Sequence, residues 1–137
     1  MQNNQATFKM PKRILVVGRN VPDLLPLLRQ FPVEVFTDET RWQEADIIIS
    51  HGGDGALLGA ERKFPGIPKC PIRDDAMNPK CPAHSIKSIL NQLFEGKLEC
   101  SHLDTLQAEF NGQHLSAIND LVITRELGSG AIRYRIT

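Results

Sequence analysis

The sequence lacks an excess of charge of either sign, because 16 Lys and Arg residues are balanced by 16 Asp and Glu residues. Without a net positive field, a protein does not attract nucleic acid or an anionic membrane at long range. The sequence also lacks an apolar run of the roughly 20 residues that span a bilayer. Residues 1–12 lack the apolar segment of a signal peptide, and we expect them to be disordered. These absences predict a cytoplasmic protein whose partners include neither nucleic acid nor a membrane.

Cysteine is scarce, with only Cys70, Cys81 and Cys100 among 137 residues. An odd and sparse set argues against a disulfide framework. The tripeptide Lys-Cys-Pro occurs at both Cys70 and Cys81, and His84 and His102 are nearby, so a zinc site has to be considered. The spacing matches neither a zinc knuckle nor a zinc ribbon. We therefore expect free thiols and no metal site.

Residues 13–96 carry the pattern of a parallel α/β domain. Ile14 to Gly18 form a short β-branched run, typical of a strand buried on both faces. Apolar residues at helical spacing follow, with Asp23 as the expected N-cap. Asp46 to Ser50 is the strongest strand signal, and it leads into Gly52-Gly53-Asp54-Gly55 and then into helix-forming residues. Strand, glycine-rich turn and helix in this order predict a Rossmann-like parallel sheet.

The pattern changes near Lys97. Leu103 to Phe110, Ser116 to Thr124 and Ala131 to Thr137 have the composition of strands. Asn111-Gly112 lies between the first two runs, and Asn-Gly between extended segments is a strong hairpin signal. Residues 97–137 are therefore predicted to be a partial β domain, the beginning of an antiparallel sheet.

The glycine-rich turn has a pattern that suits phosphate binding. Two adjacent glycines after a buried strand let the backbone turn tightly and approach a ligand without Cβ clashes. The following helix directs its first N–H groups and the positive end of its dipole into the same space. Asp54 is unusual there, because a carboxylate repels phosphate unless it accepts a proton or contacts Mg²⁺ through water. The alternative is a purely structural turn in which Asp54 caps the helix.

His51 and residues 73–75 allow both a functional and a structural interpretation. His51 could contact a phosphate or a ribose, or it could be a strand-end histidine satisfied by the backbone, which we favour. Arg73, Asp74 and Asp75 could line a cleft or form a solvated turn.

The segment from Ile47 to Arg62 resembles the one that defines the NAD kinase family. Its Gly-Gly-Asp-Gly core is shared with diacylglycerol, sphingosine and 6-phosphofructo-kinases, so the core alone indicates only a superfamily. A second segment, Ala117-Ile118-Asn119-Asp120-Leu121-Val122-Ile123, is similar to the Ala-Leu-Asn-Glu-Val-Val-Ile of NAD kinases and favours that family. Leu90 to Leu98 is similar to the helix and glycine that lead into the family's β domain.

The resemblance implies an ATP-dependent kinase that phosphorylates NAD to NADP. Asp54 would act as general base toward the 2′-hydroxyl of the adenosine ribose as that oxygen attacks the γ-phosphate of ATP. It also implies Mg²⁺ as the companion of ATP, NAD as the substrate, and a homo-oligomer formed through the β domain. The nucleotide-binding residues that it implies are Gly52, Gly53, Gly55, Asn119 and Asp120.

The sequence departs from the family's pattern at several places. Pro71-Ile72-Arg73 occurs where the family usually has a strand ending in Gly-Ile-Asn, and Ala56 replaces a common Thr. The family's later nucleotide-binding segments, including Gly-Ser-Thr-Ala-Tyr, are not among these 137 residues. Two alternatives to an NAD kinase therefore stay open: a non-catalytic nucleotide-binding fragment or divergent member, and a lipid or sugar kinase with the same turn.

Overall fold

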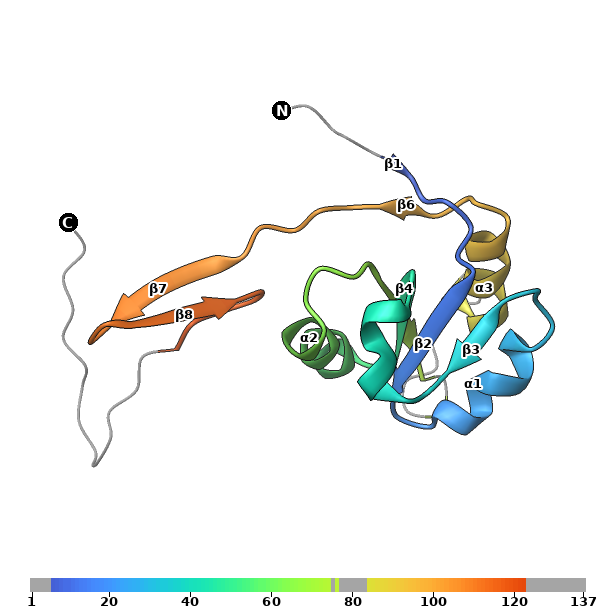
Figure 1. Ribbon diagram of the computed structural model, residues 1–137, viewed down its shortest axis with the longest axis horizontal. Helices are drawn as coiled ribbons and strands as arrows, with labels where there is room; N and C mark the ends of the chain where they lie inside the picture. Colours follow the sequence, from blue (N-terminus) through green and yellow to red (C-terminus); the bar gives the residue numbers. More distant parts are fainter. Residues whose placement is uncertain (1–5, 75, 77–83, 123–137) are drawn as a thin grey trace. The chain divides into compact units, whose positions relative to one another are not determined.

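The computed structural model describes residues 6–74, 76 and 84–122 (Figure 1). The chain divides into two compact units, residues 1–101 and residues 102–137. Unit 1 is an α/β structure, and unit 2 contains an antiparallel hairpin. Within the described ranges, no helix has both the length and the apolar character needed to cross a membrane.

Unit 1 is built on a parallel sheet with the strand order β3-β2-β4-β5. The side chains from Ile14 to Val17 in β2 and all those of β4 are buried, because both strands have neighbours on two edges and helices on two faces. The predicted parallel α/β fold is thus present, and the glycine-rich turn directly follows a central strand. The strands are β2 (Arg13–Gly18), β3 (Glu34–Phe36), β4 (Ile47–Gly52) and β5 (Lys69–Arg73).

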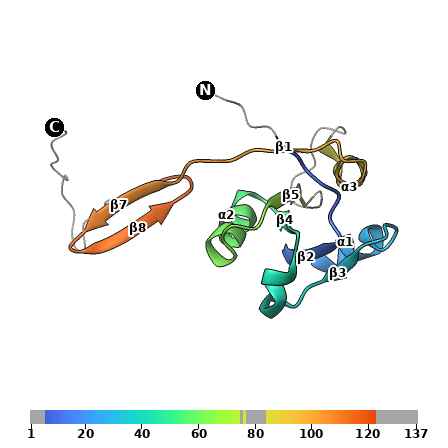
Figure 2. The same ribbon diagram turned by 45° about the horizontal axis from the view of Figure 1, so that its top comes forward.

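One face of the sheet is covered by α1 (Val21–Leu28) and α3 (Ile86–Phe94), which lie on the same side in Figure 2. Phe31 and Phe94 stack with their ring centroids 3.9 Å apart, which joins the two helices at their ends. This core contains Ile14, Val16, Leu24, Leu28, Ile47, Ile49, Cys70, Ile72, Leu90 and Leu93.

The opposite face is covered by α2 (Asp54–Lys63) and the 3₁₀ helix η1 (Glu39–Glu44). Trp42 packs on Phe64 with ring centroids 5.8 Å apart, and an ion pair between Lys63 and Glu39 also connects the two helices. Helices on both faces of a parallel sheet make this a doubly wound arrangement. The buried residues of this second core are Leu15, Val17, Phe36, Ala45, Ile48, Ala60 and Phe64.

The first helix begins earlier than the sequence pattern predicts. The sequence predicts Asp23 as the N-cap, but α1 starts at Val21 and its N-cap is Asn20, in the left-handed region with φ 48°. Pro22 fits the first turn because an N–H there has no helical partner to lose. The Asn20 side chain makes no cap hydrogen bond, because it is used elsewhere, as described for the candidate site.

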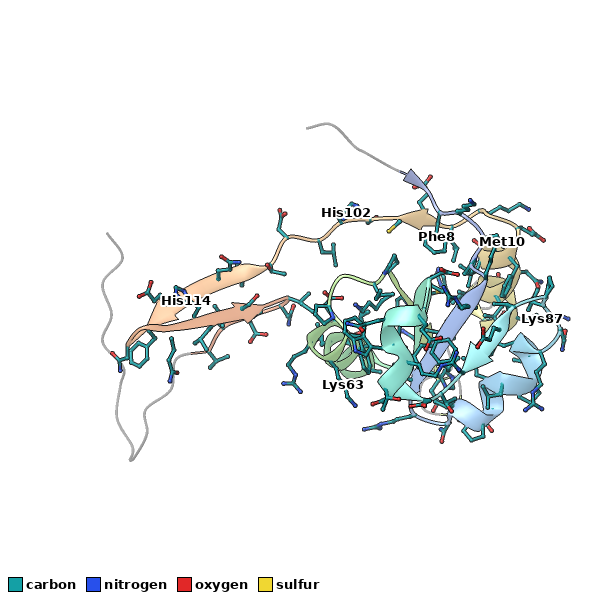
Figure 3. The ribbon with its side chains drawn as sticks, viewed as in Figure 1. Phe8, Met10, Lys63, Lys87, His102 and His114 are labelled. Atoms are coloured by element: carbon teal, nitrogen blue, oxygen red, sulfur yellow. The ribbon has the colours of Figure 1, made fainter. Side chains whose placement is uncertain are left out.

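Residues 6–12 are ordered, in contrast to the expected disorder of residues 1–12. A short strand, β1 (Ala6–Thr7), pairs antiparallel with β6 (Glu99–Cys100). Phe8 is partly buried against the core under α1 and α3 (Figure 3). Since β6 belongs to unit 1 through this pairing, unit 1 ends at Ser101 rather than near Lys97.

Unit 2 contains the hairpin that Asn111-Gly112 predicts. β7 (Leu106–Phe110) and β8 (Gln113–Ala117) are joined by these two residues, whose φ angles are 50° and 75°. Positive φ at both central positions is the type I′ geometry that suits a two-residue loop. Such a loop requires pairing to resume at Gln113, so β8 begins three residues before the predicted strand at Ser116. The predicted strand at residues 131–137 lies outside the described residues.

The hairpin has one apolar and one polar face. Cross-strand register places Leu106 opposite Ala117 and Ala108 opposite Leu115, on the same face as Phe110. His114, labelled in Figure 3, lies opposite Glu109 on the other face. The large apolar side chains are exposed: Leu106 by 50%, Phe110 by 68% and Leu115 by 45%.

Candidate functional site

The turn after β4 has the backbone geometry that its glycines predict. Gly52 is buried with φ 145°, a conformation that favours glycine, and a Cβ there would lie 3.0 Å from the Ala56 Cβ. Gly53 follows as the N-cap of α2. At Gly53 and Gly55 a Cβ would meet nothing within 4 Å. Packing within the described chain therefore accounts for Gly52, but not for Gly53 or Gly55.

Asp54 is the first residue of α2 and not its N-cap. The first helical hydrogen bonds run from the N–H groups of Ala56 and Leu57 to the Gly53 carbonyl, at 3.0 and 3.4 Å. The Asp54 side chain makes no cap hydrogen bond and is 91% exposed. The structural interpretation, in which Asp54 caps the helix, is therefore wrong. Its carboxylate faces solvent at the positive end of the helix dipole.

A pocket of about 250 Å³ lies beside the turn, at the carboxyl ends of β4 and β5. This edge of a parallel sheet is where open α/β folds bind ligands. A pocket with an apolar wall and a few charged groups at its rim suits a small organic ligand with an anionic group. Leu57, Ile72 and Ile89 form the apolar wall, and residues 52–54, Arg73 and His84 form the polar rim.

Arg73 and Asp54 face each other across this rim. The Arg73 Nη2 lies 3.8 Å from the Asp54 Oδ1, beyond hydrogen-bond length, and the Arg73 side chain is 41% exposed. An ion pair of this kind is weak because water screens both charges. Both groups are thus available to a ligand that offers a better partner.

The neighbouring position at the carboxyl edge, between β2 and β4, is bridged by contacts between the two strand ends. The Arg19 N–H donates to the His51 carbonyl at 2.8 Å, and the His51 Nδ1 lies 2.6 Å from the Arg19 carbonyl. A Cβ on Gly18 would lie 2.1 Å from the His51 carbonyl oxygen, so the two strand ends are in direct contact. Doubly wound sheets usually bind ligands where the strand order reverses, which is here between β2 and β4. In this chain the pocket lies one strand further along, at β4 and β5.

The His51 side chain hydrogen-bonds to the backbone and is not among the residues that line the pocket. It is 1% exposed, and since a carbonyl only accepts, Nδ1–H is the donor to Arg19. This matches the favoured interpretation of a strand-end histidine satisfied by the backbone. The Nε2 of His51 and the Oγ of Ser50 are buried without a hydrogen-bond partner among the described residues.

Asp74 is a further buried group at this edge, only 5% exposed. Its Oδ2 accepts from the Asn20 Nδ2 at 2.5 Å, and its Oδ1 accepts from the Ala76 N–H at 3.1 Å. A solvated turn is therefore the wrong interpretation for Asp74, while Asp75 lies outside the described residues. Sequence reasoning missed the Asn20–Asp74 pair, although both residues follow parallel strands whose carboxyl ends share one edge.

Asn119 and Asp120 belong to unit 2, whose position relative to the turn is not determined. Within that unit both are exposed, and the Asn119 Nδ2 donates to the Asp120 Oδ1 at 3.1 Å. The predicted substrate-binding pair is thus self-paired within unit 2.

The cysteines do not gather with other metal ligands in the described part of the chain. Cys70 lies in β5 with its side chain buried in the core beneath α1 and α3, and burial raises the pKa of its thiol to about 11. Such a thiol stays protonated at neutral pH and is a poor ligand and nucleophile. Cys81 lies outside the described residues. Among those that are described, no three His, Cys, Asp or Glu side chains form a group that could hold a metal ion.

Comparisons with family models, with curated proteins and with solved structures gave no match to this chain.

Proposed function

We propose that this chain carries the nucleotide-binding part of an ATP-dependent NAD kinase of the cytoplasm. In this proposal unit 1 is the Rossmann-like domain, and the hairpin of unit 2 begins an antiparallel β domain through which copies associate. The observation that carries the proposal is Asp54, an exposed carboxylate at the start of α2 and on the rim of a pocket. It has no structural task as a cap, and it lies where phosphate-binding turns place their ligands.

The chemistry follows from that position. Asp54 would accept the proton of the NAD 2′-hydroxyl as its oxygen bonds to the γ-phosphorus of ATP and the bond to the β-phosphate oxygen breaks, releasing ADP. The open space around Gly53 and Gly55 supports a close approach of phosphate oxygens to the backbone. Asn119 and Asp120 would hold NAD, an assignment that rests on the resemblance alone.

Mg²⁺ fits this site only as the companion of ATP. Asp54 is a single carboxylate beside Arg73, and Mg²⁺ normally keeps several waters when it binds one carboxylate and substrate phosphates. The metal would supply charge neutralisation for the transferred phosphoryl group.

A second candidate, a non-catalytic nucleotide-binding protein, is favoured by the size of the pocket. At about 250 Å³ it lies below the usual 300–1,000 Å³ of small-molecule sites and has no room for a dinucleotide together with ATP. In this alternative the same turn holds one mononucleotide, and no phosphoryl transfer follows. A lipid kinase is less favoured, because the resemblance at Asn119 and Asp120 points to NAD.

Amide NMR titration with ATP and with NAD tests the proposal. We expect shifts at residues 52–58, with weak affinity because a small open pocket leaves much of the ligand in water. Shifts confined to residues far from the turn would contradict nucleotide binding there. NADP formation, measured with a longer protein that includes the family's later segments, separates the kinase from the non-catalytic alternative.

A further inference from the structure

Arg73 occupies a position that the proposed function does not yet use. It is the last residue of β5, and its strand partner Gly52 is the first glycine of the turn. The guanidinium of Arg73 therefore lies at the rim of the pocket, which residues 52–54 of the turn also line. Pro71-Ile72-Arg73 replaces the Gly-Ile-Asn of the NAD kinases, so the resemblance offers no role for this cation.

Asp54 is a poor permanent partner for Arg73. The 3.8 Å contact is too long for a hydrogen bond, and the carboxylate is 91% exposed. A guanidinium forms its strongest contacts as two parallel N–H bonds to a phosphate or carboxylate, and the contact with Asp54 lacks this geometry. Among the residues that the structure describes, Arg73 thus keeps its charge at the pocket without a hydrogen-bonded partner for its guanidinium.

We propose that Arg73 is the anion-binding residue of this pocket, and that a ligand phosphate replaces Asp54 as its partner. The ligand class is a nucleotide whose base or sugar rests on the wall of Leu57, Ile72 and Ile89 while a phosphate lies between Arg73 and the start of α2. This inference rests on the proposed function, since it assigns the phosphate contact of the same site. The exchange also separates Asp54 from its cation, which leaves the carboxylate free to accept a proton.

Calorimetric titration of the full chain with ADP and with adenosine tests this role, because the two probes differ only in the diphosphate. We expect the wild-type chain to bind ADP at least about tenfold more tightly than adenosine. Arg73→Gln should remove most of this advantage, with only the share from the start of α2 remaining, and should leave adenosine binding unchanged. Arg29→Gln is the matched control, because Arg29 is an exposed arginine at the C-terminal end of α1. It should bind ADP like the wild type.

Two further variants keep the test decisive. Arg73→Lys retains the charge but not the fork, so it should lose several-fold in ADP affinity, and it replaces Arg73→Gln if that variant melts early. Asp54→Asn removes the competing carboxylate and should tighten ADP binding, by less when Arg73 is already Gln.

The outcomes distinguish this inference from the function on which it rests. If ADP shifts the amides of residues 52–58 but binds equally well to Arg73→Gln, the role of Arg73 is wrong and the nucleotide site stands. If Asp54→Asn tightens ADP binding equally in both backgrounds, the exchange of partners is wrong. If the wild-type chain binds neither probe, the proposed function and the inference are both overturned.

Discussion

Gly52 and Asp54 belong to the same turn but have different requirements: Gly52 is constrained by its backbone conformation, whereas Asp54 exposes its carboxylate. Gly52 is fixed by its φ of 145° and by the nearby Ala56, so its requirement is structural. Asp54 is 91% exposed and is not the N-cap of α2, and its contact with Arg73 is a weak ion pair, so its side chain can change with little loss of stability. Replacements at the two positions should therefore fail in different ways, one in folding and the other in chemistry.

In a longer protein with kinase activity, Asp54→Asn should reduce NADP formation by about 10²- to 10⁴-fold, the usual contribution of a general base. Asn keeps the shape but cannot accept a proton. The melting temperature should stay close to that of the wild type, because an exposed side chain is changed. Asp23→Asn, an exposed acid in the first turn of α1, is the control and should retain turnover. Near-normal turnover of Asp54→Asn would refute the assignment of a general base.

Asp46 connects the start of β2 to the start of β4. Its Oδ2 accepts from the N–H groups of Lys12 and Arg13 at 2.8 and 2.9 Å. Burial acts to raise the pKa of this carboxyl, but the two hydrogen bonds and the nearby cations outweigh it and lower the pKa below 3.8. A lowered folded-state pKa stabilises the protein above the unfolded pKa, and this contribution is lost as the pH falls through the folded pKa.

Asp46→Ala should therefore lower the free energy of unfolding by about 1 kcal/mol near pH 7, a modest value because the group is exposed. The difference from the wild type should shrink as the pH falls below about 4, where the unfolded carboxyl protonates. Urea unfolding at several pH values measures the difference in the free energy of unfolding and its dependence on pH. A pH-independent difference would show that packing, and not the charge of Asp46, is responsible.

At the scale of elements, the sequence predicts those helices, strands and turns whose structure depends on neighbouring residues in the chain. β2, β4, α2 and the Asn111-Gly112 hairpin follow from apolar runs and from glycine. The two-residue strand β1 was missed, because its partner β6 lies at the far end of unit 1 and no periodicity marks so short a segment. The same holds for the candidate site. The sequence predicts the glycine-rich turn, but it does not predict the Arg73–Asp54 and Asn20–Asp74 pairs, because these depend on the register of parallel strands.

The start of α3 offers a test of a single capping bond. The Ser85 Oγ accepts from the Ser88 N–H at 3.2 Å, and Leu90 and Leu93 of this helix are buried in the core. Ser85→Ala should lower the free energy of unfolding by about 1 kcal/mol, because one helical N–H loses its acceptor. Ser85→Asp restores an acceptor and should recover most of the loss. Equal stability of all three proteins in urea unfolding would mean that the cap contributes nothing.

At the scale of the whole molecule, the hairpin of unit 2 exposes an apolar face, and its outer strand edges have no partner strand among the described residues. Leu106, Phe110 and Leu115 are each at least 45% exposed on that face. Exposed sheets of this kind tend to pair with other chains. We therefore expect the full chain to self-associate through unit 2, with the apparent mass from light scattering rising with concentration.

Phe110→Glu should shift this association toward the monomer, because burying a carboxylate in an apolar contact is unfavourable. Gln107→Glu adds the same charge on the opposite face of the hairpin and should have little effect. A wild-type chain that stays monomeric at high concentration would contradict association through this surface.

The place of β4 in the sheet also sets the timescale on which the turn can open. β4 is paired with β2 and β5, and its side chains are buried on both faces. Amides in such a strand exchange with deuterium only through nearly global unfolding, whereas exposed hairpins exchange through small local openings. The backbone of Gly52 should therefore be among the slowest parts of the molecule to open. In the proposed function, a nucleotide that reaches the turn would meet a surface already held in place, so little of its binding free energy would be needed to order the protein.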